Sequence, residues 1–262
     1  MKNNRLFKIL LIIVIIAAIV GITLLFKNKG KDKEASEEEV KGAENLTQLV
    51  VTLTNGFNTR FFGQELLFEK DKTTYEDLTR GCVLFAASNY VIDFDLENSI
   101  QNNILTSIEV NYKYSMNDYT PFRGEAIRQA IKELFDVEFK NESAIDEANF
   151  GYNFIYIEEF DIYLKGRNSS FAYPNSDNFI KTRIIKTTKN KDKNIETEIA
   201  VAYVTKENDE YVYSKKASGS NKVYTTTEIG DIDKDQLDEF DHYIITYKEN
   251  DGKYSFVSIA KK

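Results

Sequence analysis

An uncharged apolar run near the N-terminus constrains this chain more than any other feature. Residues 9–26 read ILLIIVIIAAIVGITLLF, which is 18 residues without a charge. As a helix this run would be about 27 Å long, close to the hydrocarbon thickness of a bilayer. We therefore expect residues 9–26 to form a transmembrane helix in contact with the lipid bilayer, preceded by a short flank of residues 1–8.

The sequence around the run indicates an anchor that stays in the mature chain. No A-x-A cleavage site follows the run, and no cysteine stands directly after it, as a lipid-modified protein would need. Three basic residues precede the run and four follow it, so the flanking charges give little bias in orientation. Because long domains translocate largely regardless of such charges, we expect a single-pass protein of the cell membrane with its C-terminal domain outside.

The residues after the run predict a tether and then a folded domain. Residues 27–42, KNKGKDKEASEEEVKG, have no large apolar side chain except Val40, which is typical of a flexible charged tether. The domain is expected over residues 43–262. The whole chain has a net charge of −8 and its first 33 residues carry +6, so the rest carries −14. So acidic a domain is repelled by phosphate, and nucleic acid is not an expected partner.

The first half of the domain has helical periodicity. Apolar residues recur on one helical face from Ala43 onward, at Leu46, Leu49, Val50, Leu53 and Phe57. Thr74 and Asp77 fit a capping box, which predicts a second helix from about Tyr75 with Cys82 on its buried side.

Two further segments complete the expected helical half. Residues 90–114 combine helical spacing at first with alternation at Val110 and Tyr112, so we predict a helix followed by an extended segment. Thr120 and Pro121 predict the start of a helix that ends at Phe135, since proline suits the first helical turn.

The second half of the domain alternates with a period of two, which predicts strands. Residues 195–203 have the clearest pattern, with Ile195, Ile199 and Val201 on one face and Glu196 and Glu198 on the other. The other expected strands are residues 154–164, with a bulge near Glu158 and Glu159, and residues 179–188, 211–214, 223–229, 243–247 and 254–259.

This order of elements predicts an α+β fold in which helices pack on one face of a C-terminal antiparallel meander. The layout of residues 75–262 resembles NTF2-like and cystatin-like folds, in which a curved sheet wraps a helix. The anchor, tether and domain together also resemble single-pass extracytoplasmic proteins of Gram-positive bacteria. Neither resemblance implies an activity.

The acidic turn of residues 231–238 is the one candidate for calcium. Asp231, Asp233 and Asp235 alternate as carboxylates that could converge on the ion. The sixth position of an EF-hand loop needs Gly and is Gln236 here, while the twelfth needs Glu and is His242. We therefore predict that residues 231–238 form a solvated acidic turn or a short helix starting near Asp233, and we assign no metal site.

Catalytic motifs give no assignment either. The single histidine, His242, has no serine in a G-x-S-x-G elbow to act with, because Ser218-Gly219-Ser220 lacks the flanking glycines. Glu158, Glu159 and Asp161 could supply an acid and a base for cleavage of a glycosidic bond.

No cofactor is expected. The chain has no glycine-rich phosphate-binding motif, and one cysteine with one histidine cannot make a zinc site. Since Cys82 is alone, no internal disulfide can form.

Surface recognition is the function class that remains. Eleven tyrosines fall in the strand half, and tyrosine combines a rigid apolar ring with a polar tip suited to peptide or glycan contact. They are Tyr152, Tyr156, Tyr163, Tyr173, Tyr203, Tyr211, Tyr213, Tyr224, Tyr243, Tyr247 and Tyr254. The alternative is that tyrosine simply favours strands.

We therefore expect a non-catalytic, membrane-anchored protein whose partner is a protein or a cell-wall polymer. The alternatives are an envelope enzyme that acts on wall polymer through its acidic residues, or an accessory or regulatory subunit of a membrane complex.

Overall fold

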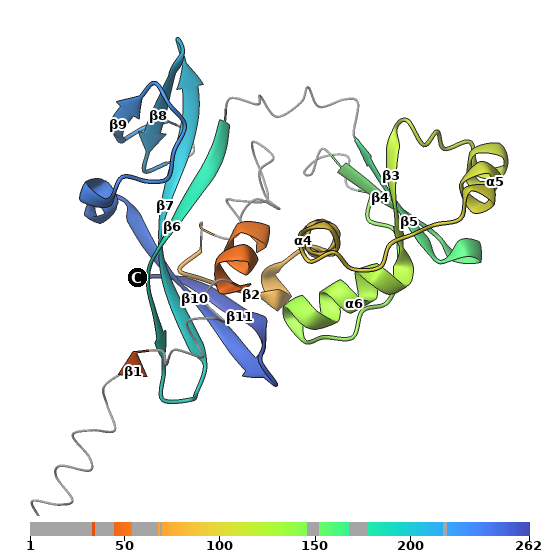
Figure 1. The fold of residues 1–262 in the computed structure, drawn as a ribbon, viewed down its shortest axis with the longest axis horizontal. Coiled ribbons are helices and arrows are strands. Elements are labelled where there is room, and N and C mark those ends of the chain that lie inside the picture. The colour runs from red at the N-terminus through yellow and green to blue at the C-terminus, as the bar shows by residue number, and fades with distance from the viewer. Residues whose placement is uncertain are drawn as a thin grey trace, which may run out of the picture.

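The computed structural model describes residues 33–34, 45–53, 68, 70–145, 152–167, 178–216 and 219–262. Within this part of the chain, two antiparallel sheets lie on either side of a layer of helices (Figure 1). The expected α+β class and antiparallel pairing are confirmed. The predicted anchor of residues 9–26 lies outside the described residues, and no helix within them is long and apolar enough to span a membrane.

The larger sheet has eight strands in the order β1-β6-β7-β10-β11-β2, with β8 paired to β7 and β9 paired to β8. Its strands are β1 (Lys33–Glu34), β2 (Lys72–Thr74), β6 (Asn178–Lys189), β7 (Ile195–Glu207), β8 (Glu210–Ser214), β9 (Lys222–Thr226), β10 (Asp241–Asn250) and β11 (Lys253–Lys261). Every strand expected from residue 179 onward is found, and Asp251 and Gly252 join the last two.

The central strand β7 is buried on both faces. Ile195, Ile199 and Val201 face the helices, as expected, and belong to the main hydrophobic core. Ala200 and Ala202 point the other way, yet both are also buried. Their small side chains leave room for a second cluster with Tyr213, Ile232 and Phe240, which covers this face. The expectation of a half-buried strand was therefore wrong over this stretch.

The smaller sheet has the strand order β3-β5-β4 and stands on the other side of the helices (Figure 1). Its strands are β3 (Tyr119–Arg123), β4 (Tyr152–Ile157) and β5 (Ile162–Arg167). One face packs against α5 (Asn102–Tyr112) through Ile108, Ile162 and Leu164. The opposite face carries Tyr163 into the main core.

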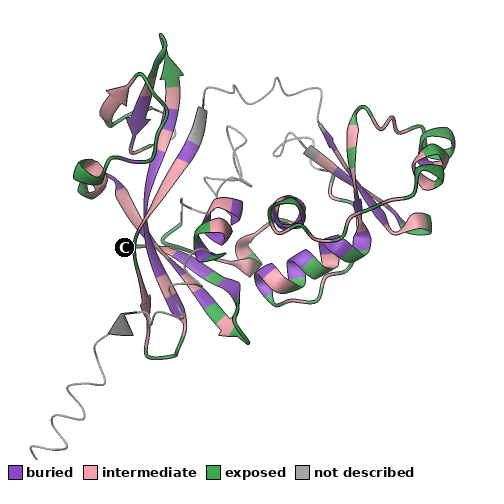
Figure 2. Ribbon diagram, viewed as in Figure 1, coloured by how far each residue is buried: buried purple, intermediate pink, exposed green. Residues whose placement is uncertain are grey.

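The helices between the sheets hold the core together. They are residues 45–53, α4 (Arg80–Asp93) and α6 (Gly124–Phe135). Figure 2 shows buried residues on α4 and α6 and on the strands that face them. Cys82, Ile127 and Ile131 are fully buried there, so the expected core position of Cys82 is confirmed.

Two helix boundaries differ from the prediction because strand pairing competes with local signals. Thr120 and Pro121 do not open a helix: they lie in β3, an edge strand that pairs only with β5, where a missing proline N–H is tolerated. The helix α6 begins only at Gly124, whereas its end at Phe135 is as expected. The Thr74–Asp77 capping box forms, with a 2.8 Å bond from the Thr74 N–H, but it caps the short 3-10 turn η1 (Tyr75–Asp77), and α4 starts after Thr79.

Two expected extended segments also differ. Val110 and Tyr112 lie in α5 and are exposed, so their alternation reflects a solvent-facing helix and not a strand. The strand expected over residues 154–164 is a hairpin, in which the 3-10 turn η2 (Glu158–Phe160) replaces the predicted bulge and joins β4 to β5. Asp161 makes the turn possible by adopting a left-handed φ of 50°.

Candidate functional site

The three carboxylates that could serve an acid-base reaction lie together at η2 but do not share a site. Glu158 and Glu159 are exposed on η2, and Glu159 accepts a hydrogen bond of 2.8 Å from the Tyr112 hydroxyl of α5. Asp161 follows the turn and points toward α6. The structure therefore directs Glu159 and Asp161 to different partners.

Asp161 is the centre of a polar network between η2, α6 and the segment before β4. Arg128 donates to both carboxylate oxygens, with N–O distances of 2.8 Å. The Tyr156 hydroxyl and the Asn141 amide donate to Oδ1 at 2.8 and 3.0 Å. The Gly124 N–H also donates to the Asp161 backbone carbonyl at 2.6 Å. Both the backbone and the side chain of Asp161 thus hold the start of α6.

This environment favours the charged carboxylate. The hydrogen bonds from Arg128 lower the pKa of Asp161 below its ordinary value, while partial burial acts in the opposite direction. A general acid needs a raised pKa, because it must carry a proton at neutral pH. Asp161 is therefore suited to a structural ion pair and not to the acid role in glycoside cleavage.

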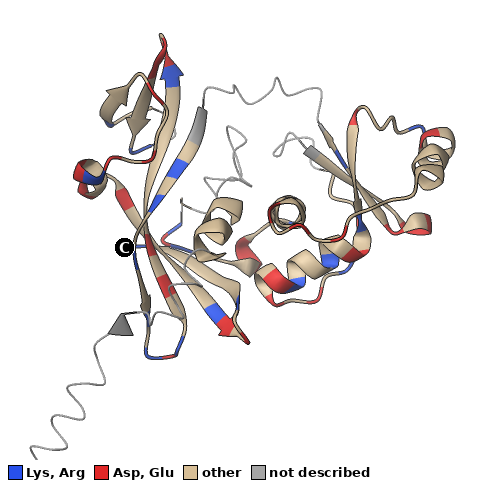
Figure 3. Cartoon of the chain, in the orientation of Figure 1, with Lys and Arg blue, Asp and Glu red and all other residues tan. Residues whose placement is uncertain are grey.

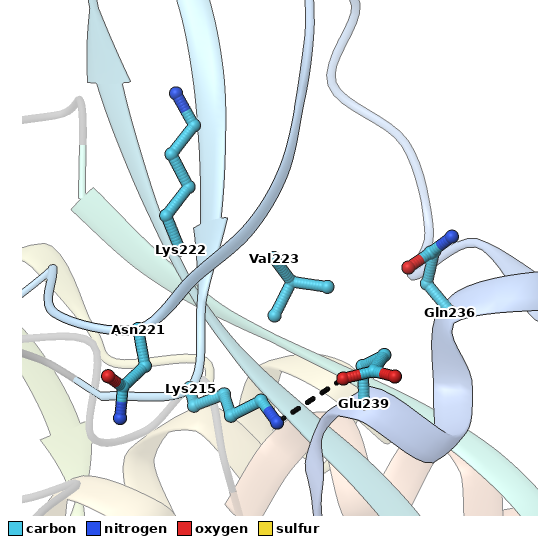
Figure 4. Close-up of a pocket in the computed structure, with 6 residues that line it drawn as sticks. All are labelled: Lys215, Asn221, Lys222, Val223, Gln236 and Glu239. Atoms are coloured by element: carbon cyan, nitrogen blue, oxygen red, sulfur yellow. Dashed lines mark hydrogen bonds and ion pairs between the residues drawn. The ribbon is translucent and has the colours of Figure 1, made fainter.

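A polar pocket lies between the β8–β9 hairpin and the 3-10 helix η3 (Lys234–Glu239) (Figure 4). Its volume is about 400 Å³. Lys215, Asn221, Lys222, Val223, Gln236 and Glu239 line it. Lys215 lies 3.5 Å from the Glu239 carboxylate across the pocket. The lining offers both donors and acceptors, which suits a ligand with hydroxyl, amide or charged groups more than an apolar one.

The acidic turn of residues 231–238 is used mainly to start η3. Asp233 is the N-cap residue, and its carboxylate accepts a hydrogen bond of 3.0 Å from the Asp235 N–H. The short helix expected from Asp233 is therefore confirmed. Among the residues that the structure describes, no group of three or more His, Cys, Asp and Glu side chains is placed to hold a metal ion.

The single histidine links η3 to the larger sheet. His242 Nδ1 lies 3.0 Å from the Glu198 carboxylate, and Nε2 lies 3.0 Å from the Leu237 carbonyl oxygen. Both neighbours are acceptors, so each tautomer of the neutral ring donates to one of them. Lys262 contacts the same Glu198 oxygen at 2.7 Å, and Lys186 lies 3.5 Å from the other. His242 is thus part of a structural charge cluster on β7 and β10.

Replacing Glu198 with Gln is expected to reduce the free energy of unfolding by about 2–3 kcal/mol at pH 7, because it leaves the surrounding cations without their buried counter-charge. Burial raises the pKa of Glu198, but the contacts with Lys262 and His242 outweigh it, so the pKa is lowered from 4.5. The stabilisation that Glu198 provides is fully present above the pKa that this group has in the unfolded chain. It is lost as the pH falls below that pKa. Urea unfolding at pH 7 and in acid measures both effects.

The matched control is Glu210→Gln, because Glu210 is an exposed carboxylate at the start of β8. It should change stability by less than about 0.5 kcal/mol at either pH. An equal loss for the two variants would contradict the buried role of Glu198.

The sequence patterns did not single out Lys165 on β5, a lysine whose ammonium lies against the core. Its ammonium lies 4.0 Å from the centre of the Phe85 ring and donates to Ser88 Oγ at 2.9 Å. Burial lowers its pKa from 10.5 to about 8. A signal was available, because Lys165 is two residues from Tyr163 and so lies on the same, inward face of the strand.

The tyrosines of the strand half do not form an exposed aromatic surface within the described residues. Tyr163, Tyr213 and Tyr247 are fully buried, and the other six whose side chains are described are buried or half-buried. The reason is that helices cover one face of the larger sheet, and the cluster of Tyr213, Ile232 and Phe240 covers the other face around Ala200 and Ala202. The alternative, that tyrosine is present because it favours strands, accounts for these positions.

Comparisons of this chain with models of protein families, with curated proteins and with solved structures find no match. The expected likeness to NTF2-like or cystatin-like folds therefore stays a prediction.

Proposed function

We propose that this chain is a non-catalytic, single-pass membrane protein whose α+β domain lies outside the cytoplasm and binds another component of the cell envelope. The observation that carries the proposal is the uncharged run of residues 9–26. Eighteen uncharged residues match the length that a bilayer-spanning helix requires. A helix buried in the core of a soluble domain is typically shorter and does not require so long a run without charge. The acidic domain would then be held at the membrane surface by this anchor.

The polar pocket beside η3 supports a binding role. Its lining contains two lysines, two amides and one carboxylate within one cavity of about 400 Å³. Groups of this kind recognise the hydroxyl, amide and carboxylate groups that wall polymers and polar peptide segments present. The enzyme alternative has less support, because Asp161 is engaged with Arg128 at 2.8 Å and has a lowered pKa.

The first test concerns the anchor and the side on which the domain lies. Protease added to intact cells is expected to digest the domain, while an alkaline carbonate wash leaves the undigested chain in the membrane fraction. A cytoplasmic protein measured in the same cells controls for lysis. A domain that resists protease on intact cells, or a chain that the wash releases, would contradict the proposal.

The second test concerns the partner. A photo-crosslinking residue at Gln236 is expected to capture a specific wall polymer or protein in living cells, because Gln236 lines the pocket. The same residue at Val110, which is 58% exposed on α5, is the control position. Equal products from both positions, together with wall-degrading activity that Glu158→Gln or Asp161→Asn abolishes, would favour the enzyme alternative.

A further inference from the structure

The pairing of β1 fixes which end of the larger sheet is nearest to the start of the chain. Lys33 pairs with Lys189, and Glu34 pairs with Thr188, so β1 is antiparallel to β6. Lys33, the first residue of β1, therefore lies at the end of β6 from which the β6–β7 turn begins. Figure 1 shows β1 beside that turn, far from the β8–β9 hairpin.

The same pairing limits the distance between this turn and the predicted anchor. Lys33 is seven positions after Phe26, so their Cα atoms are no more than about 25 Å apart. The turn begins directly after Lys189, the residue that pairs with Lys33. If residues 9–26 span a bilayer, Lys33 lies within about 25 Å of the end of that span, so the β6–β7 turn is within reach of the bilayer surface.

The sequence has two lysine-rich segments at this pairing, one that ends at Lys33 and one that starts at Lys189. Residues 27–33 read KNKGKDK and residues 189–194 read KNKDKN, with net charges of +3 and +2. The residues after position 33 carry −14 overall, so a basic end is unusual in this domain. Figure 3 shows the lysines of the turn in blue at the end of β6.

The turn has a defined shape that presents two of its lysines to solvent. The Asn190 side-chain oxygen accepts hydrogen bonds of 3.0 Å from the N–H groups of Asp192 and Asn194. Lys191 and Lys193 are exposed on this turn, whereas Lys189 pairs with Glu249 at 3.0 Å.

The neighbouring β10–β11 turn offers little free positive charge. Its lysines, Lys248 and Lys253, are paired with Asp136 and Glu133 of the α6 region at 3.2 and 2.8 Å. Asp251 at its tip is exposed. Among the described residues, the basic character of this end of the sheet thus comes from the β6–β7 turn.

We propose that the β6–β7 turn, through Lys191 and Lys193, docks on the anionic lipid headgroups around the anchor. This inference rests on the proposed membrane anchor. A surface of anionic lipids attracts each nearby lysine, and the attraction decays over a Debye length of about 8 Å at physiological salt. Docking would hold the sheet upright on the membrane, with the β8–β9 hairpin at the far end of β7.

The test uses the full chain in lipid nanodiscs made of phosphatidylcholine, with or without phosphatidylglycerol. A fluorophore is placed at Asn194→Cys in the turn or at Thr227→Cys beyond β9, both in a Cys82→Ala background. A quencher attached to lipid headgroups reports proximity to the bilayer. We expect strong quenching only at position 194, only in discs with phosphatidylglycerol, and less quenching at high salt.

Removing the charges of Lys191 and Lys193 distinguishes docking of the turn on the lipid from attachment through the anchor alone. Lys191→Gln/Lys193→Gln should reduce the ratio of docked to undocked chains by about 25-fold, since each lysine accounts for about fivefold. The matched control, Lys206→Gln/Lys234→Gln, removes the same charge at two exposed lysines outside the turn and should leave the quenching unchanged.

The possible failures point to different causes. Equal quenching with and without phosphatidylglycerol, equal quenching at positions 194 and 227, or no effect of the lysine variant would overturn the docking proposal while the anchor stands. A chain that does not co-purify with the nanodiscs would overturn the proposed membrane anchor and this inference with it.

Discussion

Replacing Lys165 with Met is expected to stabilise the domain by about 2 kcal/mol at pH 7, because it removes a charge from the interface between β5 and α4. Ser88 keeps a hydrogen bond after the change, since its hydroxyl also donates to the Phe85 carbonyl at 2.8 Å. Methionine has a similar length and can pack against the Phe85 ring. Urea unfolding of the full chain measures the difference.

The pH dependence gives this prediction a second, independent readout. Burial lowers the pKa of Lys165 from 10.5 to about 8, so between these values the unfolded chain holds a proton that the folded chain has released. The free energy of unfolding therefore rises with pH, and the rise between pH 7 and pH 9 is about 1 kcal/mol. Lys165→Met should lose this rise.

The control is Lys222→Met, which replaces an exposed lysine of β9 and should retain the rise with pH. The Lys165 ammonium also lies 3.4 Å from the Asn89 side-chain oxygen. A Lys165→Met variant that is less stable than the original at pH 7 would show that the ammonium's contacts with Phe85, Ser88 and Asn89 outweigh the cost of burying its charge.

Gly124→Ala is expected to lower the free energy of unfolding by about 2–4 kcal/mol, because the start of α6 has no room for a Cβ atom. The added atom would overlap the Asp161 carboxylate and would lie 3.0 Å from the Asp161 carbonyl oxygen. Asp161 would have to move and give up contacts with Arg128, Tyr156 or Asn141. Thermal or urea unfolding measures the loss.

Gly230→Ala is the matched control, because a Cβ at that position has no atom within 4 Å. It should change stability by less than about 0.5 kcal/mol. The double variant Gly124→Ala/Asp161→Ala should be less destabilised than the sum of the two single variants, since Asp161→Ala removes the carboxylate that the new Cβ meets. Strict additivity would argue against this steric coupling.

Hydropathy and periodicity predicted much of the fold because they report burial directly. The alternation of Ile195, Ile199 and Val201 identified the inward face of β7, and the apolar stripe of α6 identified its buried residues. The boundaries failed where partners far along the chain decide the local structure. Pro121 reads as a helix start, but pairing with β5 places it in a strand.

The candidate site residues were less accessible to sequence reasoning. Asp161 was recognised as one of three acidic residues, but its partner Arg128 lies 33 positions away and no local pattern joins the two. Lys165 and Glu198 are charged residues in strands, and their environment depends on what covers each face. The polar pocket likewise combines residues of a hairpin with residues of η3.

By itself, the sequence determined the apolar run of residues 9–26, the acidic character of the rest and the change from helical to strand periodicity, since each depends only on residues that are near one another in the chain. The tertiary structure alone decided that two sheets enclose the helices, that Asp161 is bound by Arg128, and that β1 pairs with the end of β6. These features depend on pairing and packing between distant segments, and local preferences do not specify which segments will meet.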